Sequence, residues 1–145
     1  MSWIRLPTAS SVRKASRILL VIAHPDDEVM FFTPLLRYLQ STSAIVSILC
    51  LSDGNFEGIG TVRSLELIKC AAMFSIATQD VHIVNHDQLQ DGMKNDWPAH
   101  VVAEIVQRYI LSIEPSLVSY CILLFFSVCM CACITCGTIP AGCYI

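Results

Sequence analysis

Three short apolar runs alternate with three helical patterns, and this alternation constrains the fold more than any other feature of the sequence. The apolar runs, each with the length of a buried strand, cover residues 17–23, 44–51 and 81–84. The helical patterns cover residues 29–39, 61–76 and 99–111. Strands that alternate with helices form parallel sheets with right-handed crossovers. We therefore expect an α/β fold with a parallel sheet, and chemistry at the carboxyl ends of its strands.

Charge divides the chain into regions of different character. All nine basic and twelve acidic residues lie at or before Glu114, and six of the eight cysteines follow it. We expect a basic, flexible leader over residues 1–17, which an organellar transit peptide also fits, then an α/β part over 18–114 and an apolar, Cys-rich tail over 115–145. A net charge of -3 argues against a nucleic-acid partner, and a content of 54% hydrophobic residues excludes a disordered chain.

The sequence of residues 117–136 in the tail is compatible with two alternative structures. Twenty residues that are almost all apolar can cross a bilayer as a helix, but residues 117–126 equally suit a fourth, buried parallel strand. The cysteines at 129, 131, 133 and 136 have a spacing that can bind a soft metal. A membrane-buried or palmitoylated segment and an aberrant end without function are the alternatives.

A histidine and three carboxylates follow the first apolar run directly, in the string His24-Pro-Asp-Asp-Glu28. Charges beside a buried strand end are costly unless they are paired, and a divalent metal would pair with them. His24 and Asp27 are ligand types that zinc accepts, and Asp26 can take a proton from water bound to the metal. The alternative is an ordinary helix start with acidic residues and a surface histidine.

Residues 21–32, which contain this string, resemble the signature of the PIG-L/LmbE-like de-N-acetylases. The similarity continues through Ser52-Asp-Gly-Asn55, Gly60-Thr-Val-Arg-Ser-Leu-Glu66, Leu89-Gln-Asp-Gly-Met93 and Trp97, and covers about residues 17–114. It implies a Rossmann-like, three-layer αβα fold of the LmbE-like type, shortened here after about the fourth strand.

The resemblance also implies roles for five residues. His24 and Asp27 match the first two zinc ligands of the family, and Asp26 matches its general base. Arg63 matches an arginine that contacts the substrate, although a salt bridge to Glu66 one helical turn away is equally expected. Asp87 matches a contact to a sugar hydroxyl.

The reaction implied is zinc-dependent removal of acetate from N-acetylglucosaminyl-phosphatidylinositol, a step in the synthesis of GPI anchors. The partners implied are this glycolipid and the endoplasmic reticulum membrane, with the catalytic part on the cytosolic face.

The sequence departs from the family pattern after Glu114. The family takes its third zinc ligand from a later motif of the type Gly-Val-Ser-Gly-His-x-x-His, and no such motif occurs here. His82, His86 and His100 fall in a strand, a loop and a helix start, and we expect none of them to replace that ligand. Three functions therefore remain open: the deacetylase itself, a catalytically incomplete isoform that acts as a membrane-associated binding module, or a small metal-binding protein that uses the cysteine tract.

Overall fold

A five-stranded sheet forms the centre of the protein, in a computed structural model that describes residues 13–92, 95–124 and 128–135. The strand order is β3-β2-β1-β4-β5. The strands are β1 (Arg17–Ile22), β2 (Ile45–Cys50), β3 (Val81–Ile83), β4 (Leu117–Leu124) and β5 (Val128–Thr135). The helices are α2 (Asp27–Leu39), α3 (Gly60–Met73) and α4 (Ala99–Ile113), with short 3-10 turns η1 (Asn55–Glu57) and η2 (Thr78–Asp80).

The first four strands are parallel, which confirms the predicted α/β class and its parallel sheet. Strand β1 is the central strand: Ile18 pairs with Val46 of β2 on one side and with Leu117 of β4 on the other. The β1–β4 pair joins distant parts of the chain, and the Ser116 hydroxyl accepts the N–H groups of Ser16 and Arg17 across 100 and 99 residues.

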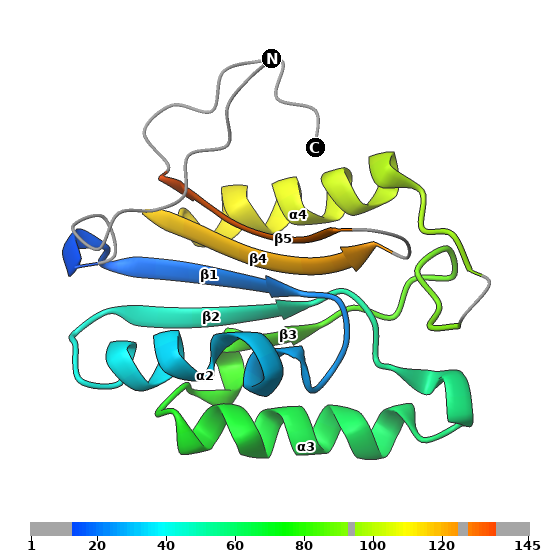
Figure 1. Cartoon of the computed structure of the whole chain (residues 1–145), viewed down its shortest axis with the longest axis horizontal. Coiled ribbons are helices and arrows are strands. Elements are labelled where there is room, and N and C mark those ends of the chain that lie inside the picture. Colours follow the sequence, from blue (N-terminus) through cyan, green and yellow to red (C-terminus); the bar gives the residue numbers. More distant parts are fainter. Residues whose placement is uncertain (1–12, 93–94, 125–127, 136–145) are drawn as a thin grey trace.

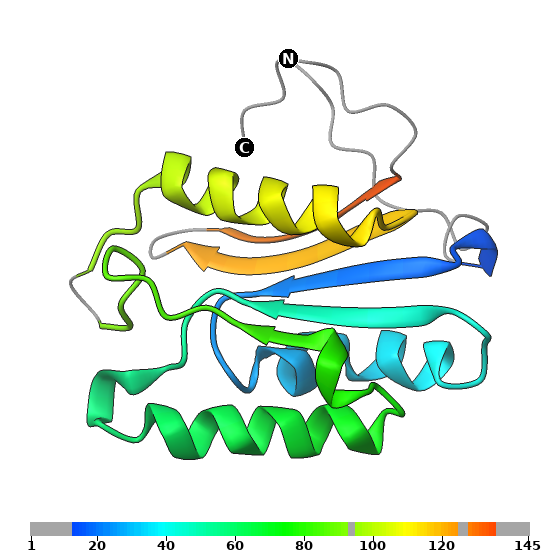
Figure 2. The ribbon, with the colours of Figure 1, turned by 180° about the vertical axis from the view of Figure 1, so that it is seen from behind.

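Helices cover both faces of the sheet, giving the predicted three layers. Helices α2 and α3 lie on one face and α4 lies on the other (Figures 1 and 2). The side chains of β1 alternate between these layers, because successive residues of a strand point to opposite faces. Leu19 and Val21 join the core beneath α4, whereas Leu20 and Ile22 join the core beneath α2 and α3.

The element boundaries differ slightly from the prediction. Helix α2 begins at Asp27, two residues before the expected start at Val29, and therefore takes both acidic residues into its first turn, where the helix dipole favours them. Helix α3 ends at Met73, earlier than the predicted end at Ile76, because Ser75 takes a left-handed backbone conformation with φ 64°.

The tail segment forms strands in the described residues. Strand β4 spans 117–124, and β5 spans 128–135 and runs antiparallel to β4, a strand that the sequence did not predict. No helix within the described ranges combines the length and apolar character needed to cross a bilayer. The side chains of the predicted cysteine cluster (129, 131, 133 and 136) and residues 1–12 of the predicted leader lie outside the described residues.

Candidate active site

The Asp27 carboxylate is folded back onto the turn between β1 and α2. Its Oδ2 atom accepts the N–H groups of Ala23 and His24, both at 3.0 Å. Burial raises the pKa of the Asp27 carboxyl above its ordinary value, and the N–H group of His24 opposes that rise. One carboxylate therefore fixes the backbone of the turn that presents His24.

Asp26 occupies a strained position in the same turn. Its backbone has φ 114°, in the left-handed region that residues with side chains rarely adopt. The buried Glu28 carboxylate accepts the Asp26 N–H group at 2.9 Å and stabilises this conformation. The Asp26 carboxylate itself is 60% exposed. Strain of this kind is often found where a side chain must be aimed at a ligand.

Arg63, in the first turn of α3, connects three loops at the carboxyl edge of the sheet, the right-hand edge in Figure 1. Its guanidinium donates to the carbonyl oxygens of Pro25 at 2.7 Å and Gly54 at 2.9 Å. It also pairs with the carboxylates of Asp26 at 3.1 Å and Asp91 at 3.4 Å. Because the side chain is only 22% exposed, these contacts are partly shielded from water.

Asp91 joins Arg63 to the histidine of the first turn. Its Oδ1 atom lies 3.2 Å from His24 Nε2, while its other oxygen faces Arg63. The His24 ring packs against Trp97, with 5.4 Å between ring centroids, and the Trp97 indole N–H donates to the Gln90 carbonyl oxygen at 3.1 Å. The segment after β3 therefore supports His24 by both charge and packing.

Polar side chains also follow β2 and β3. The Asn85 amide donates to the Asp53 carboxylate at 3.0 Å, and its carbonyl accepts from Gln90 at 2.8 Å. Residues that follow three parallel strands thus meet at one edge of the sheet, as the strand order requires.

The loop after β2 approaches Arg63 so closely at position 54 that a side chain there would displace the guanidinium. Gly54 has φ 68°, and a Cβ atom there would lie 2.2 Å from Arg63 Nη1. By contrast, a Cβ atom at Gly58, which has φ 77°, would meet nothing within 4 Å. The glycine at 54 is therefore a packing requirement of the cluster as well as a turn residue.

Comparison with protein families gives this cluster its context. The family model described as "PIG-L: GlcNAc-PI de-N-acetylase" matches residues 19–123. The chain belongs to the PIG-L family. The match contains β1 from Leu19 onward, the turn with His24 and Asp27, α3 with Arg63, and all but the last residue of β4.

Relatives within the PIG-L family carry matching names. A probable N-acetylglucosaminyl-phosphatidylinositol de-N-acetylase of Schizosaccharomyces pombe is 47% identical over 97 residues, which are 63% of this chain and 39% of that protein. The enzyme of that name from Saccharomyces cerevisiae is 46% identical over 81 residues, 54% of this chain and 26% of the relative. The bovine enzyme is 33% identical over 95 residues, 66% and 38% of the two chains. The chain thus spans less than two fifths of the length of these relatives.

A solved structure shares the PIG-L fold described here. The N,N'-diacetylchitobiose deacetylase of Pyrococcus horikoshii, in complex with its inhibitor, matches with a TM-score of 0.62 at 17% identity. The match covers 74% of this chain and 41% of the deacetylase. It supports the Rossmann-like, LmbE-like architecture.

Four of the five predicted site residues of this PIG-L chain share one edge of the sheet. His24, Asp26 and Asp27 occupy one turn, and Arg63 reaches that turn from α3. Arg63 contacts Asp26 and Asp91, and no ion pair between it and Glu66 occurs among the described residues. Asp87 is exposed, and its carboxylate has no hydrogen-bond or ion-pair partner in the described part of the chain. The roles of these residues remain predictions.

Asp91 was not among the predicted site residues. Asp91 lies inside the segment Leu89–Met93 that supported the resemblance, four residues after the chosen Asp87. The signal that could have identified it is Gly92, the next residue, where a Cβ atom would lie 2.8 Å from Asn95 Nδ2. The Asn95 N–H group donates to the Gly92 carbonyl oxygen at 3.0 Å, so a turn follows Asp91 directly.

The predicted zinc ligands are two of the three that a catalytic zinc site takes from protein. Among the residues whose side chains the structure describes, no group of three His, Cys, Asp or Glu side chains is arranged to hold a metal ion. His24 and Asp27 therefore have no third donor beside them in this part of the chain, and they do not form a complete zinc site.

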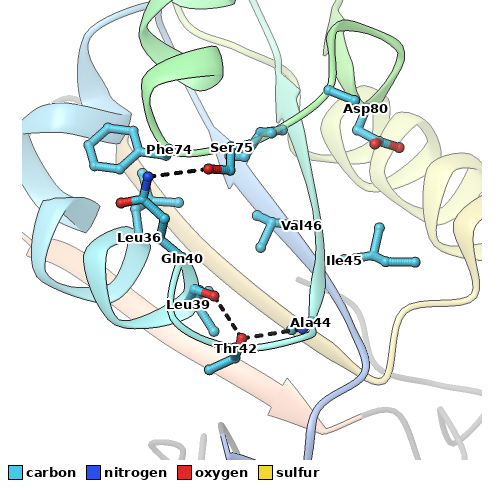
Figure 3. A pocket seen from close by; sticks show the side chains of 12 residues that line it. Leu36, Leu39, Gln40, Thr42, Ala44, Ile45, Val46, Phe74, Ser75 and Asp80 are labelled. Carbon is cyan, nitrogen blue, oxygen red and sulfur yellow. Dashed lines mark hydrogen bonds between the residues drawn. The ribbon is translucent and has the colours of Figure 1, made fainter.

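A cavity of about 230 Å³ lies at the opposite edge of the sheet, between the ends of α2 and α3 and the start of β2 (Figure 3). Its walls include Leu36, Leu39 and Phe74, and Gln40 donates to the Ser75 hydroxyl across it at 3.2 Å. Asp80 is its only titratable lining residue. This cavity contains none of the predicted site residues.

Proposed function

We propose that this chain carries the first half of the active site of an N-acetylglucosaminyl-phosphatidylinositol de-N-acetylase, which acts in the synthesis of GPI anchors. The observation that supports it most is the joining of His24, Asp26, Arg63 and Asp91 in one charged cluster at the carboxyl edge of the sheet. The names of the relatives supply the substrate, a glycolipid with an N-acetylglucosamine headgroup. The membrane involved is that of the endoplasmic reticulum, with the site on its cytosolic face.

Hydrolysis of the acetamide needs a water molecule that loses a proton as it attacks the carbonyl carbon. Asp26 is the proposed base, because its carboxylate is exposed while Arg63 holds it in a fixed direction at 3.1 Å. The proton passes from water to Asp26 as the water oxygen bonds to the carbonyl carbon. Asp26 then returns a proton to the amide nitrogen as the C–N bond breaks, so that acetate and the free amine leave. Arg63 is also the proposed contact to substrate phosphate or sugar, and Asp87 to a sugar hydroxyl.

The proposed metal ion is zinc, and its proposed ligands are His24 and Asp27. Imidazole and carboxylate are two of the usual ligands of zinc. The Nε2 atom of His24 faces Asp91, an arrangement in which a carboxylate fixes the orientation of a metal-binding imidazole. Because the described residues lack a third donor beside this pair, we assign the ion no step of the reaction.

Acetate release from N-acetylglucosaminyl-phosphatidylinositol, with the full chain in membranes and added zinc, tests the proposal. Asp26→Asn should lower the rate about 100-fold or more, as loss of a general base does. Asp80→Asn is the matched control, because it makes the same chemical change at the opposite edge of the sheet. Folded protein that binds the glycolipid but releases no acetate refutes the deacetylase and supports the binding module instead.

A further inference from the structure

Large apolar side chains are exposed beside the charged cluster. Phe56 in η1 is 61% exposed, and Ile59, Val62 and Leu65 at the start of α3 are 44%, 53% and 53% exposed. On a helix, residues three apart are neighbours, so these side chains form one stripe that leads away from η1. We call these four residues the apolar rim.

The apolar rim is continuous with the site. The segment that carries Phe56 follows Gly54, whose carbonyl oxygen accepts from Arg63 at 2.9 Å. The Phe56 ring also lies beside the turn that follows Asp91, because a Cβ atom at Gly92 would be 3.6 Å from Phe56 Cδ2. Met30, whose N–H group donates to the Asp26 carbonyl oxygen, is 67% exposed. Apolar side chains from η1 and from α2 therefore lie on either side of the charged cluster.

Hydrogen bonds hold the loop that carries Phe56 and Ile59. The Asn55 side-chain oxygen accepts the Gly60 N–H group at 2.9 Å, and the Asn55 backbone carbonyl oxygen accepts the Gly58 N–H group. The Ile59 backbone carbonyl oxygen accepts the Arg63 N–H group. These bonds restrain the backbone that carries Phe56 and Ile59. Exposed apolar groups on a rigid support next to a binding site mark a surface that meets an apolar partner.

We infer that the apolar rim inserts into the surface of a lipid bilayer and holds the charged cluster at the level of the lipid headgroups. The inference rests on the proposed function for its choice of partner: a substrate anchored in a bilayer brings its apolar chains and its polar headgroup to the protein together. All four rim side chains are apolar, so burial of apolar area supplies their attraction to the bilayer.

Co-sedimentation of the full chain with vesicles of phosphatidylcholine and phosphatidylinositol tests this inference without turnover. The double variant Phe56→Ser/Ile59→Ser should lower the partition coefficient about tenfold, since two apolar side chains no longer leave water. The matched control is Met73→Ser/Leu111→Ser, which removes side chains that are 76% and 70% exposed at other places. The control should bind as the unchanged chain does, and equal losses in both variants overturn the inference.

A second measurement reports where the rim lies. In a Trp3→Phe/Trp97→Phe background, which removes the native tryptophans, the fluorescence of Phe56→Trp should be quenched by lipids brominated on their acyl chains. The fluorescence of Met73→Trp in the same background should not be quenched. Equal quenching at the two positions overturns the inference. Sedimentation velocity tests whether the rim instead contacts a second copy of the chain: if the unchanged chain is a dimer and the rim variant is a monomer, the inference is also overturned. These vesicles carry no acetylated headgroup, so vesicle binding does not depend on deacetylation. The binding and quenching results would therefore stand even if the deacetylase proposal failed.

Discussion

The Nη2 atom of Arg63 donates a hydrogen bond to the carbonyl oxygen of Pro25 at 2.7 Å, joining the start of α3 to the turn after β1. The two residues are 38 positions apart in the sequence. Through this contact and that with Gly54, one side chain satisfies carbonyl groups of two loops and restrains both.

Replacing Arg63 with alanine should lower the free energy of unfolding by about 1–3 kcal/mol, because two carbonyl groups and two carboxylates lose a charged donor. Urea unfolding followed by circular dichroism measures the change. Arg108→Ala is the control, since Arg108 makes one exposed ion pair with Glu104 and its loss should cost less than about 0.5 kcal/mol. Equal losses in the two variants contradict the bridging role of Arg63.

Alanine at position 54 should be more harmful than alanine at position 58. Both glycines have left-handed backbones, so both variants carry a conformational cost of about 1–2 kcal/mol. Only Gly54→Ala also drives a Cβ atom into the Arg63 guanidinium, which adds about 1–3 kcal/mol. Thermal or urea unfolding of the two variants gives the difference. If it vanishes in an Arg63→Ala background, the clash is its cause; if it persists there, this account is wrong.

Asp91→Asn should destabilise the protein by about 1–2 kcal/mol, because Arg63 and His24 both lose a charged partner. Asp87→Asn makes the same change on an exposed carboxylate that has no partner among the described residues, and its unfolding free energy should stay the same. Unfolding in urea again compares the pair. A double-mutant cycle with Arg63→Ala should show coupling for Asp91 and none for Asp87, and coupling for Asp87 counts against this arrangement.

The fold was predictable because each element carries its own pattern. The apolar run of β1 and the acidic start of α2 gave the strand, the helix and the turn between them to within two residues. Strand β5 was not predictable, since its residues suit a strand, a membrane segment or a metal site equally well by composition. In the site, the compact His24–Glu28 string was visible, whereas the contact of Asp91 depends on how a distant loop folds.

The two cysteines of the α/β part should differ in reactivity. Cys50 is buried, whereas Cys70 is only partly buried. Burial raises the pKa of Cys70 to about 11, with the neighbouring Glu28 acting in the same direction. Burial also raises the pKa of Cys50, further than that of Cys70.

A thiolate forms as pH rises toward the thiol pKa, so alkylation of Cys70 should accelerate about tenfold for each pH unit between about pH 7 and 9. Cys50 should stay unmodified in the native protein over the same range. Mass spectrometry of peptides after iodoacetamide treatment measures both sites, with protein in concentrated urea as the control. Faster labelling of Cys50 than of Cys70 in folded protein contradicts this order.

The bond between the Ser116 hydroxyl and the N–H group of Ser16 spans 100 residues, and it has a consequence for protein synthesis. Strand β1 leaves the ribosome early, but its neighbour β4 is translated only after three helices and two other strands. Until then, one edge of the central strand has no partner within the described sheet. Strand β1, buried from Ile18 to Ile22 in the finished protein, therefore keeps an open edge in the nascent chain until β4 has been made.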